Sequence, residues 1–410
     1  MAIRMKAQGN SQIRPPEGFL NLFKQSIFSL LFNFTGVFAG SFVALNLGIF
    51  SIAPWTLLAY PGILSMRGAI GGLFCGRLTT GLHLGTVKPV IFGNTRQFHL
   101  LWQAIILMTL ESSLMMGTIS SIFGILILGC TSLDVLSIFC VIMATMAISL
   151  LFVTPITMFT ALLTFRSGRD PDIIVYPVLS TVSDLTETIC YIFVLNMLFF
   201  LGNLGSFFIV SVDLALLFIS LIILSKDAKE VDFQKTIKES FLMMASVAFI
   251  VNLTGLTLGK IAEAIGTRKE IYMVYPALID TVGDVGSIVG STVTTKLALG
   301  LIRPNLASIR HHLVELIAAW TSTLIMFTLY SIAASLAQAT PSLQGFIHLT
   351  ALLYATHLQA ATLMAFIAFI VGIYTYRRGW DPDNFVIPIE SSLADAITSL
   401  SLFLAINLLG

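Results

Sequence analysis

The sequence predicts an all-α polytopic membrane protein, built from two parallel five-helix modules and one linking helix. Hydrophobic residues make up 56% of the 410-residue chain and charged residues only 10%, a balance that a soluble domain of this size does not tolerate on its surface. The apolar residues gather in eleven runs, each approaching or exceeding the ~20 residues that cross a bilayer. Two long motifs also occur twice, in the same order.

The apolar runs follow a polar stretch at residues 1–24, which we interpret as a short cytoplasmic leader because the first apolar run is too long for a cleaved signal. The loops between the runs are too short to hold an extramembrane domain. The expected spans lie at roughly 26–50, 57–84, 98–128, 133–164, 173–201, 206–224, 240–259, 272–299, 313–338, 345–375 and 384–408.

Two repeated motifs divide these spans into modules. One motif covers residues 168–198 and returns without a gap at 379–409, which is 211 residues later. The other covers 60–89 and returns at 275–304, which is 215 residues later. Because both motifs recur in the same order at nearly the same distance, the chain is a tandem duplication of a five-helix unit.

The helix at 206–224 belongs to neither copy, and it decides how the copies are oriented. A unit of five spans ends on the opposite side of the membrane from its start, so one extra span gives both modules the same orientation. They are then related by a pseudo-twofold axis along the membrane normal. The predicted domains are the leader at 1–24, the first module at 25–202, the linking helix with a charged linker at 203–239, and the second module at 240–410.

Lysine and arginine residues collect in alternate loops, as the positive-inside rule requires. With the N-terminus in the cytoplasm, the outer loops keep Lys260, Arg268 and Lys269, while most other basic residues face inwards. We therefore expect a multi-pass protein of the plasma membrane, with a cytoplasmic N-terminus and an outer C-terminus. No basic run indicates a nucleic-acid partner, so the expected surroundings are the lipid bilayer.

Asp184 and Asp395 are the strongest candidate site residues, because each lies about ten residues inside a hydrophobic helix at the same repeat position. A carboxylate at such depth costs a few kcal/mol or more and is by default a functional-site hypothesis. If the axis brings the fifth helices together, the two carboxylates face one another across a pore, and a divalent cation between them relieves their repulsion. Mg²⁺ fits because one or two carboxylates hold it while it keeps most of its waters.

Other acids and small residues extend this candidate site. Glu187 lies one turn from Asp184 on the same helix face and Asp284 lies in the glycine-rich motif, so both are candidate metal ligands. Asp280 and Glu390 are candidates for the ends of the path. A structural alternative is that neighbouring hydroxyls satisfy the two central aspartates. The pore-lining and supporting candidates are Ser180, Thr181, Ser391, Ser392, Gly68, Gly71, Gly283 and Gly286.

Glycines recur every four residues in the second span, at Gly68, Gly72 and Gly76, and in the first span at Gly36 and Gly40. Such spacing favours close approach of helix backbones. It also permits local unwinding, which exposes carbonyl oxygens where the backbone lines a water-filled path. The sequence leaves both roles open.

The run PGILSMRGAIGGLFCGRLTT at 61–80 resembles the second-helix signature of the MgtE-type magnesium transporters, particularly their animal solute-carrier relatives. The two DPD stretches with their later proline and aspartate are similar to the fifth helix of the same family. The resemblance covers residues 20–410 and implies two fused MgtE-type modules where the bacterial proteins form a homodimer. It also implies that Asp184 and Asp395 form the central ion site.

Two departures accompany this resemblance. The family's asparagine after the first glycine is Ala69 in one copy and Asp284 in the other, so the halves need not contribute equally. The cytoplasmic domains through which bacterial MgtE senses magnesium have no counterpart here. The resemblance thus implies a fused pseudo-dimer that needs no second copy, and it leaves open whether the protein is a channel or a coupled exchanger.

The expected function is divalent-cation transport, with Mg²⁺ as the first choice and Mn²⁺ or Co²⁺ as alternatives, because oxygen ligands discriminate poorly among hard divalent ions. The cation is cargo, and we expect no cofactor and no enzyme activity. One alternative is a secondary transporter of another cation or an organic solute. The weaker one is an intramembrane aspartyl protease, in which two membrane aspartates share a proton.

Overall fold

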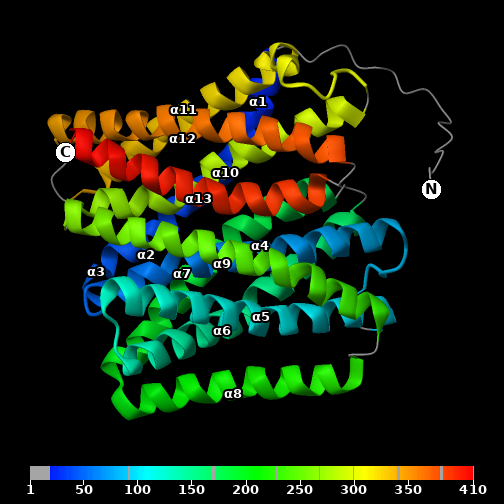
Figure 1. Ribbon diagram of the computed structural model, residues 1–410, viewed down its shortest axis with the longest axis vertical. Helices are drawn as coiled ribbons and strands as arrows, with labels where there is room; N and C mark the ends of the chain where they lie inside the picture. Colours follow the sequence, from blue (N-terminus) through cyan, green and yellow to red (C-terminus); the bar gives the residue numbers. More distant parts are fainter. Residues whose placement is uncertain are drawn as a thin grey trace.

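The computed structural model describes residues 19–90, 93–167, 171–227, 230–266, 268–298, 300–338, 342–378 and 382–409, so most of the predicted leader lies outside it. Over these ranges the secondary structure is helical, without a strand (Figure 1). The elements are α1 (Phe19–Leu30), η1 (Leu31–Thr35), α2 (Gly36–Leu45), α3 (Leu47–Phe50), α4 (Trp55–His83), α5 (Arg96–Phe123), η2 (Gly124–Leu128), α6 (Ser132–Arg166), α7 (Pro171–Phe200), α8 (Gly202–Asp227), α9 (Val231–Ile265), α10 (Lys269–Ala298), η3 (Leu306–His311), α11 (Leu313–Leu336), α12 (Leu343–Arg378) and α13 (Pro382–Leu409).

Each of the eleven predicted spans coincides with a helical segment, and the first is the composite of α1, η1 and α2. Among the described residues, ten segments are long and apolar enough to cross a membrane. The remaining one, α10, has 30 residues but carries Asp280 and Asp284 in its middle. Because α10 packs against α2, α11, α12 and α13, these acids lie inside the bundle instead of facing lipid.

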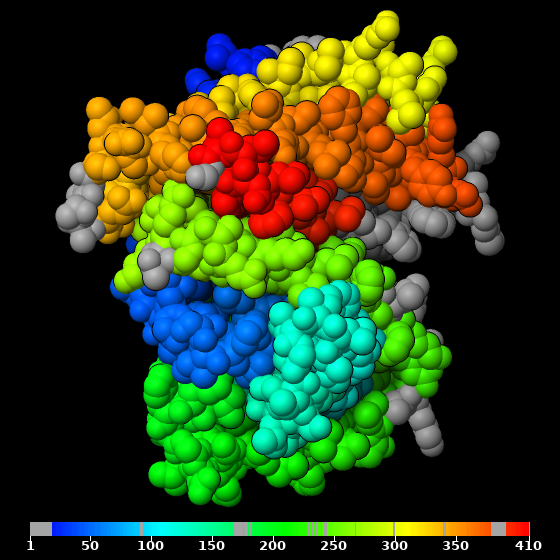
Figure 2. Space-filling view, turned by 60° about the vertical axis from the view of Figure 1, so that its left-hand side comes forward, coloured from blue at the N-terminus to red at the C-terminus, as the bar shows by residue number. Residues whose placement is uncertain are grey.

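The two five-helix units exchange their first helices. The segment α1 to α2 begins the first unit but packs against α10 and α11 of the second, while α9 begins the second unit and packs against α4 and α5 of the first. Figure 1 shows α1 beside α11, and Figure 2 shows the yellow-green part of α9 next to the red α13. The linking helix α8 lies at the edge, against α5, α6 and α7.

Glycines allow this exchange. A Cβ at Gly36 of α2 would lie 2.8 Å from the Ala277 backbone nitrogen of α10, which is too close for any side chain. Gly255 of α9 abuts the Leu58 backbone of α4 in the same way. The packing role predicted for the first span is therefore confirmed at Gly36, whereas it is wrong for α4 at Gly68 and Gly76. A Cβ at either of those two positions meets open space.

Matching loops close the two halves at one end. The loop after α4 turns through Gly85 and the loop after α10 through Gly300, at φ +71° and +70°, a left-handed conformation that favours glycine. The last turn of α6 then holds the first loop, since Arg166 Nε donates to the Pro89 carbonyl at 2.5 Å. In the second half Arg377 Nε donates to the Pro304 carbonyl at the same distance. These pairs explain why glycine and proline recur at the ends of the motif copies.

Candidate functional site

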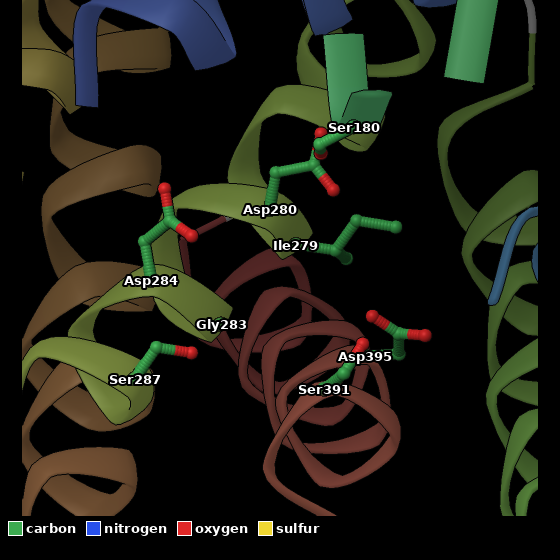
Figure 3. Close-up of a pocket in the computed structure, with 8 residues that line it drawn as sticks. All are labelled: Ser180, Ile279, Asp280, Gly283, Asp284, Ser287, Ser391 and Asp395. Atoms are coloured by element: carbon green, nitrogen blue, oxygen red, sulfur yellow. The ribbon is translucent and has the colours of Figure 1, made fainter. Parts of the chain in front are cut away.

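A cavity of about 400 Å³, open to solvent, lies between α7, α10 and α13. Polar side chains from both halves line it, and Figure 3 shows three of the carboxyl groups around it. The lining residues are Ser180, Ile279, Asp280, Gly283, Asp284, Ser287, Ser391 and Asp395. Apart from Ile279 and Gly283, these residues offer oxygen atoms, which are the ligands that hard cations prefer.

Two repeat-related contacts join the halves at this cavity. Ser65 Oγ of α4 donates a hydrogen bond to Asp395 Oδ2 of α13. The residue that corresponds to Ser65 in the second half is Asp280, and its carboxyl group lies within hydrogen-bonding reach of Asp184 on α7. Each fifth helix therefore places its aspartate against the second helix of the opposite half. Asp395 lines the cavity itself, whereas Asp184 is not among the lining residues and is linked to the cavity through Asp280. Two carboxyl groups in contact need a shared proton or a cation between them, because two negative charges there repel each other.

Two buried tyrosines fix the helices that carry these aspartates. Tyr60 of α4 hydrogen-bonds Thr188 of α7 at 3.0 Å, and Tyr275 of α10 hydrogen-bonds Ser399 of α13 at 2.7 Å. Thr188 and Ser399 lie four residues after the two central aspartates, and each donates to the backbone carbonyl of its aspartate at 2.7 Å. The repeated tyrosine thus ties the second helix to the fifth within each half, one turn from the carboxyl group.

Asp284 is the third carboxyl group that α10 and its neighbours bring to the cavity. Its Oδ2 accepts a hydrogen bond of 2.8 Å from the Asn33 side-chain amide. Ser287 lies one turn further along α10 and also lines the cavity. In the first half Ala69 occupies the position of Asp284. The cavity is therefore more acidic along α10 than along α4.

Glu187 does not line the cavity. Its Oε1 lies 3.5 Å from Arg67 Nε of α4 and also accepts a hydrogen bond from Ser149 of α6. The Arg67 and Glu187 side chains are 1% and 0% exposed, so the pair is sealed inside the first half. Arg67 Nη2 also donates to Thr154 at 2.9 Å. These contacts provide Glu187 with a structural partner in place of a cation.

The remaining predicted residues fall into three groups. Ser180, Ser391 and Gly283 line the cavity. Gly71 and Gly286 are buried, as is Ser392, and a Cβ at Gly71 would lie 3.1 Å from Leu179. The side chains of Thr181 and Glu390 lie outside the described residues. The unwinding that the glycines of α4 permit is absent from its described backbone, because α4 is continuous from Trp55 to His83.

The sequence analysis named Asp280 for an end of the path and did not name Ser65, Ser287 or Asn33. Asp280 was placed at an end of the path, but it contacts Asp184 directly. Ser65 was not considered, although its alignment with Asp280 in the repeat could have revealed it. Asn33 lies in the first helix, outside both motifs, and its signal is a shorter repeat, an asparagine with glycines three and seven residues later.

A polytopic helical bundle with carboxyl groups facing an inner polar cavity defines a membrane transporter of cations as the protein's class. Comparison with protein-family models then identifies the family: the MgtE model, described as a divalent cation transporter, matches residues 60–194 and 275–405. The chain belongs to the MgtE family and carries its transport module twice. A search of curated proteins and a search of solved structures find no match.

Proposed function

We propose that the protein transports Mg²⁺ across the plasma membrane through the cavity between its two halves, with Asp184 and Asp395 as the central ligands. The observation that carries this proposal is the pair of cross-half contacts, Ser65 with Asp395 and Asp280 with Asp184. A cation held there bridges both halves, so any relative movement of the halves alters its ligands. Asp280 joins the ligand set, and Asp284 adds negative charge beside it.

The chemistry of the cavity favours a hydrated divalent cation. Its lining is mostly polar and it is open to solvent, so a cation can enter it with bound waters. Mg²⁺ binds through one or two carboxylates and keeps its remaining waters, which suits a polar site of this kind. An organic solute favours a mostly apolar pocket with few polar groups, and this lining is the reverse.

The charge distribution supports the proposed orientation, with a cytoplasmic N-terminus and an outer C-terminus. Arg166 and Arg377 hold the loops at one end of the bundle, which is the end we assign to the cytoplasm. The fused halves supply both central aspartates, so we propose that a single chain is sufficient for transport.

Mg²⁺ flux into proteoliposomes tests this proposal. We expect flux in the wild type and its loss in Asp184→Asn/Asp395→Asn. The matched control is Asp213→Asn, because Asp213 is an intramembrane acid of the peripheral helix α8 and does not line the cavity. Wild-type flux that persists in the double variant refutes the site, and absence of wild-type flux refutes the substrate. Repeating the assay with a sodium or proton gradient separates an exchanger from a channel.

A further inference from the structure

The first helix adds a residue to this site, and the inference rests on the transport function proposed above. We infer that Asn33 is a positioning residue that holds the Asp284 carboxylate at the cavity, so that cation binding depends on the α10 side more than on the α4 side. The two halves are related by pseudo-symmetry, but they then contribute unequally to cation binding.

Asn33 is buried, with 7% of its surface exposed, and its amide has two acceptors on α10. Its Nδ2 donates to Asp284 Oδ2 at 2.8 Å and to Thr281 Oγ1 at 3.4 Å. Thr281 is itself fixed, since its Oγ1 lies 2.7 Å from the Tyr330 hydroxyl of α11. The amide therefore has a defined orientation, and its hydrogen bond to an ionised carboxylate belongs to the stronger, charge-assisted class.

An asparagine suits this role because it is neutral. A lysine or arginine partner would orient the carboxylate but cancel its charge, as Arg67 does for Glu187. The amide of Asn33 orients Asp284 and leaves its negative charge available to a cation. Asp284 can then act together with Asp280, which lies one turn earlier on the same helix face.

The helix backbone changes at this contact. Asn33 lies in η1, a 3₁₀ segment at Leu31–Thr35 that separates α1 from α2. A stretch of 3₁₀ helix inside a longer helix often marks a hinge or a strained sequence, because its hydrogen bonds are less favourable than those of an α-helix. Directly after it, Gly36 brings α2 against the Ala277 backbone of α10. The break and the glycine together place the asparagine next to the acid.

The second half contains the same motif and provides an internal control. The pattern is an asparagine, a threonine two residues later and glycines three and seven residues later. Its two copies are Asn33, Thr35, Gly36 and Gly40 in the first half, and Asn252, Thr254, Gly255 and Gly259 in the second. The two contacts differ by one helical turn, because Gly255 meets Leu58, whose repeat mate Met273 is the residue that Gly40 meets. The place of Asn33 beside the other half is therefore taken by Ala248, one turn before Asn252.

Asn252 has no carboxylate to hold, because Ala69 replaces the acid on α4. Its Nδ2 instead donates to the Ala248 carbonyl at 2.7 Å and lies 3.4 Å from Met116 Sδ. Its buried Oδ1 has no hydrogen-bond partner among the described residues. The segment around it is continuous α-helix from Val231 to Ile265. The motif is thus present twice, while the amide–carboxylate contact is present once.

The first test is the concentration dependence of Mg²⁺ uptake by proteoliposomes. Asn33→Ala is expected to raise the half-saturating Mg²⁺ concentration about tenfold, the effect of losing one charge-assisted hydrogen bond, with a smaller change in maximal rate. Asn252→Ala is expected to stay within about twofold of the wild type. Equal half-saturation in Asn33→Ala and the wild type overturns the inference, as do equal shifts in both asparagine variants.

The second test moves the acid to the other half and does not require Asn33→Ala to fold. In Ala69→Asp/Ala248→Asn/Asp284→Ala the new carboxylate should meet the new asparagine in the place where Asp284 meets Asn33. The same variant without Ala248→Asn should have a half-saturating concentration about tenfold higher, and Asn33→Ala should no longer raise it. An exchanged variant that transports Mg²⁺ equally well with and without Ala248→Asn overturns the inference. Absence of uptake in the wild type refutes the proposed function instead.

Discussion

Ser65 of α4 donates a hydrogen bond to Asp395 of α13, although 330 positions separate the two residues in the chain. The contact joins the second helix of one half to the fifth helix of the other. Its symmetry mate, the contact between Asp280 and Asp184, has a carboxyl group where the first contact has a hydroxyl. The two central aspartates therefore have different partners. The Ser65 hydroxyl is neutral, so it stabilises the Asp395 carboxylate and leaves its negative charge available to a cation.

Replacing Ser65 tests this contact. In Ser65→Ala the Asp395 carboxylate loses a donor, and a hydrogen bond to a charged group contributes about 1.5–3 kcal/mol. We expect the half-saturating Mg²⁺ concentration to rise about tenfold in the proteoliposome assay. Ser291→Ala is the control, because Ser291 lies on the exposed side of α10 and donates to the Ile288 carbonyl of its own helix. Equal uptake curves for the wild type and Ser65→Ala contradict the prediction.

The buried Arg67–Glu187 pair should contribute to folding and not to transport. Glu187→Gln leaves the Arg67 charge unpaired at 1% exposure, which costs about 3–5 kcal/mol. We expect a large fall in the thermal unfolding temperature of the detergent-solubilised protein. The second half has Val282 and Thr398 at the positions that correspond to Arg67 and Glu187. The double variant Arg67→Val/Glu187→Thr copies these residues and removes both buried charges together. It should therefore recover most of the stability that Glu187→Gln loses.

The same double variant separates the two roles considered for Glu187. If the double variant folds and transports Mg²⁺ with an unchanged half-saturating concentration, Glu187 is not a ligand of the transported cation. A stable double variant with severely impaired Mg²⁺ uptake would show that Glu187 takes part in transport. The second half, which has Val282 and Thr398 at these positions, shows that the module folds without this pair.

Much of the fold could be predicted from the sequence because its determinants are local or repeated. Long apolar runs fix the spans, and even α10 was expected as a span although its acids lower its hydropathy. The repeats fix which positions are equivalent, and so Asp184 and Asp395 were paired correctly as repeat mates. Their assignment as cation ligands stays a prediction.

The exchange of first helices could not be predicted, because hydropathy does not tell which half a helix packs against. That exchange places Asn33 beside Asp284, about 250 residues away, and Gly36 beside Ala277. The surroundings of Glu187 depend on helix packing in the same way. Helical periodicity places Glu187 on the same face as Asp184, but the position of Arg67 on a neighbouring helix decides which groups meet.

The glycines at the crossing of α2 and α10 should be sensitive to the smallest substitution. Gly36→Ala places a methyl group 2.8 Å from the Ala277 backbone nitrogen, so the helices must move apart, at a cost of about 1–3 kcal/mol. Gly76→Ala on α4 meets open space and should be neutral or stabilising by up to about 1 kcal/mol, because alanine favours a helix more than glycine does. Thermal unfolding of both variants measures the difference, and equal unfolding temperatures contradict the tight crossing.

His312, between η3 and α11, should make the protein sensitive to acid. Its ring is 0% exposed, with Nε2 lying 3.1 Å from Thr292 Oγ1 and Nδ1 lying 3.6 Å from Glu315 Oε2. Burial lowers the pKa of His312 from 6.5 to about 4, although Glu315 opposes the shift and Lys296 reinforces it. Lys296 already pairs with Glu315 at 2.6 Å, so the carboxylate is not free to compensate a second positive charge.

The sign of the effect follows from the lowered pKa. Between pH 6.5 and pH 4 the unfolded chain binds a proton at His312 that the folded protein does not, so the free energy of unfolding falls as the pH falls through this window. The unfolding temperature of the wild type should therefore drop more between pH 7 and pH 5 than that of His312→Gln, which keeps a hydrogen-bonding side chain but has no proton to gain. His83→Gln is the control, because His83 is an exposed residue at the end of α4. An equal drop in the wild type and His312→Gln would show that burial of this ring does not control the acid response.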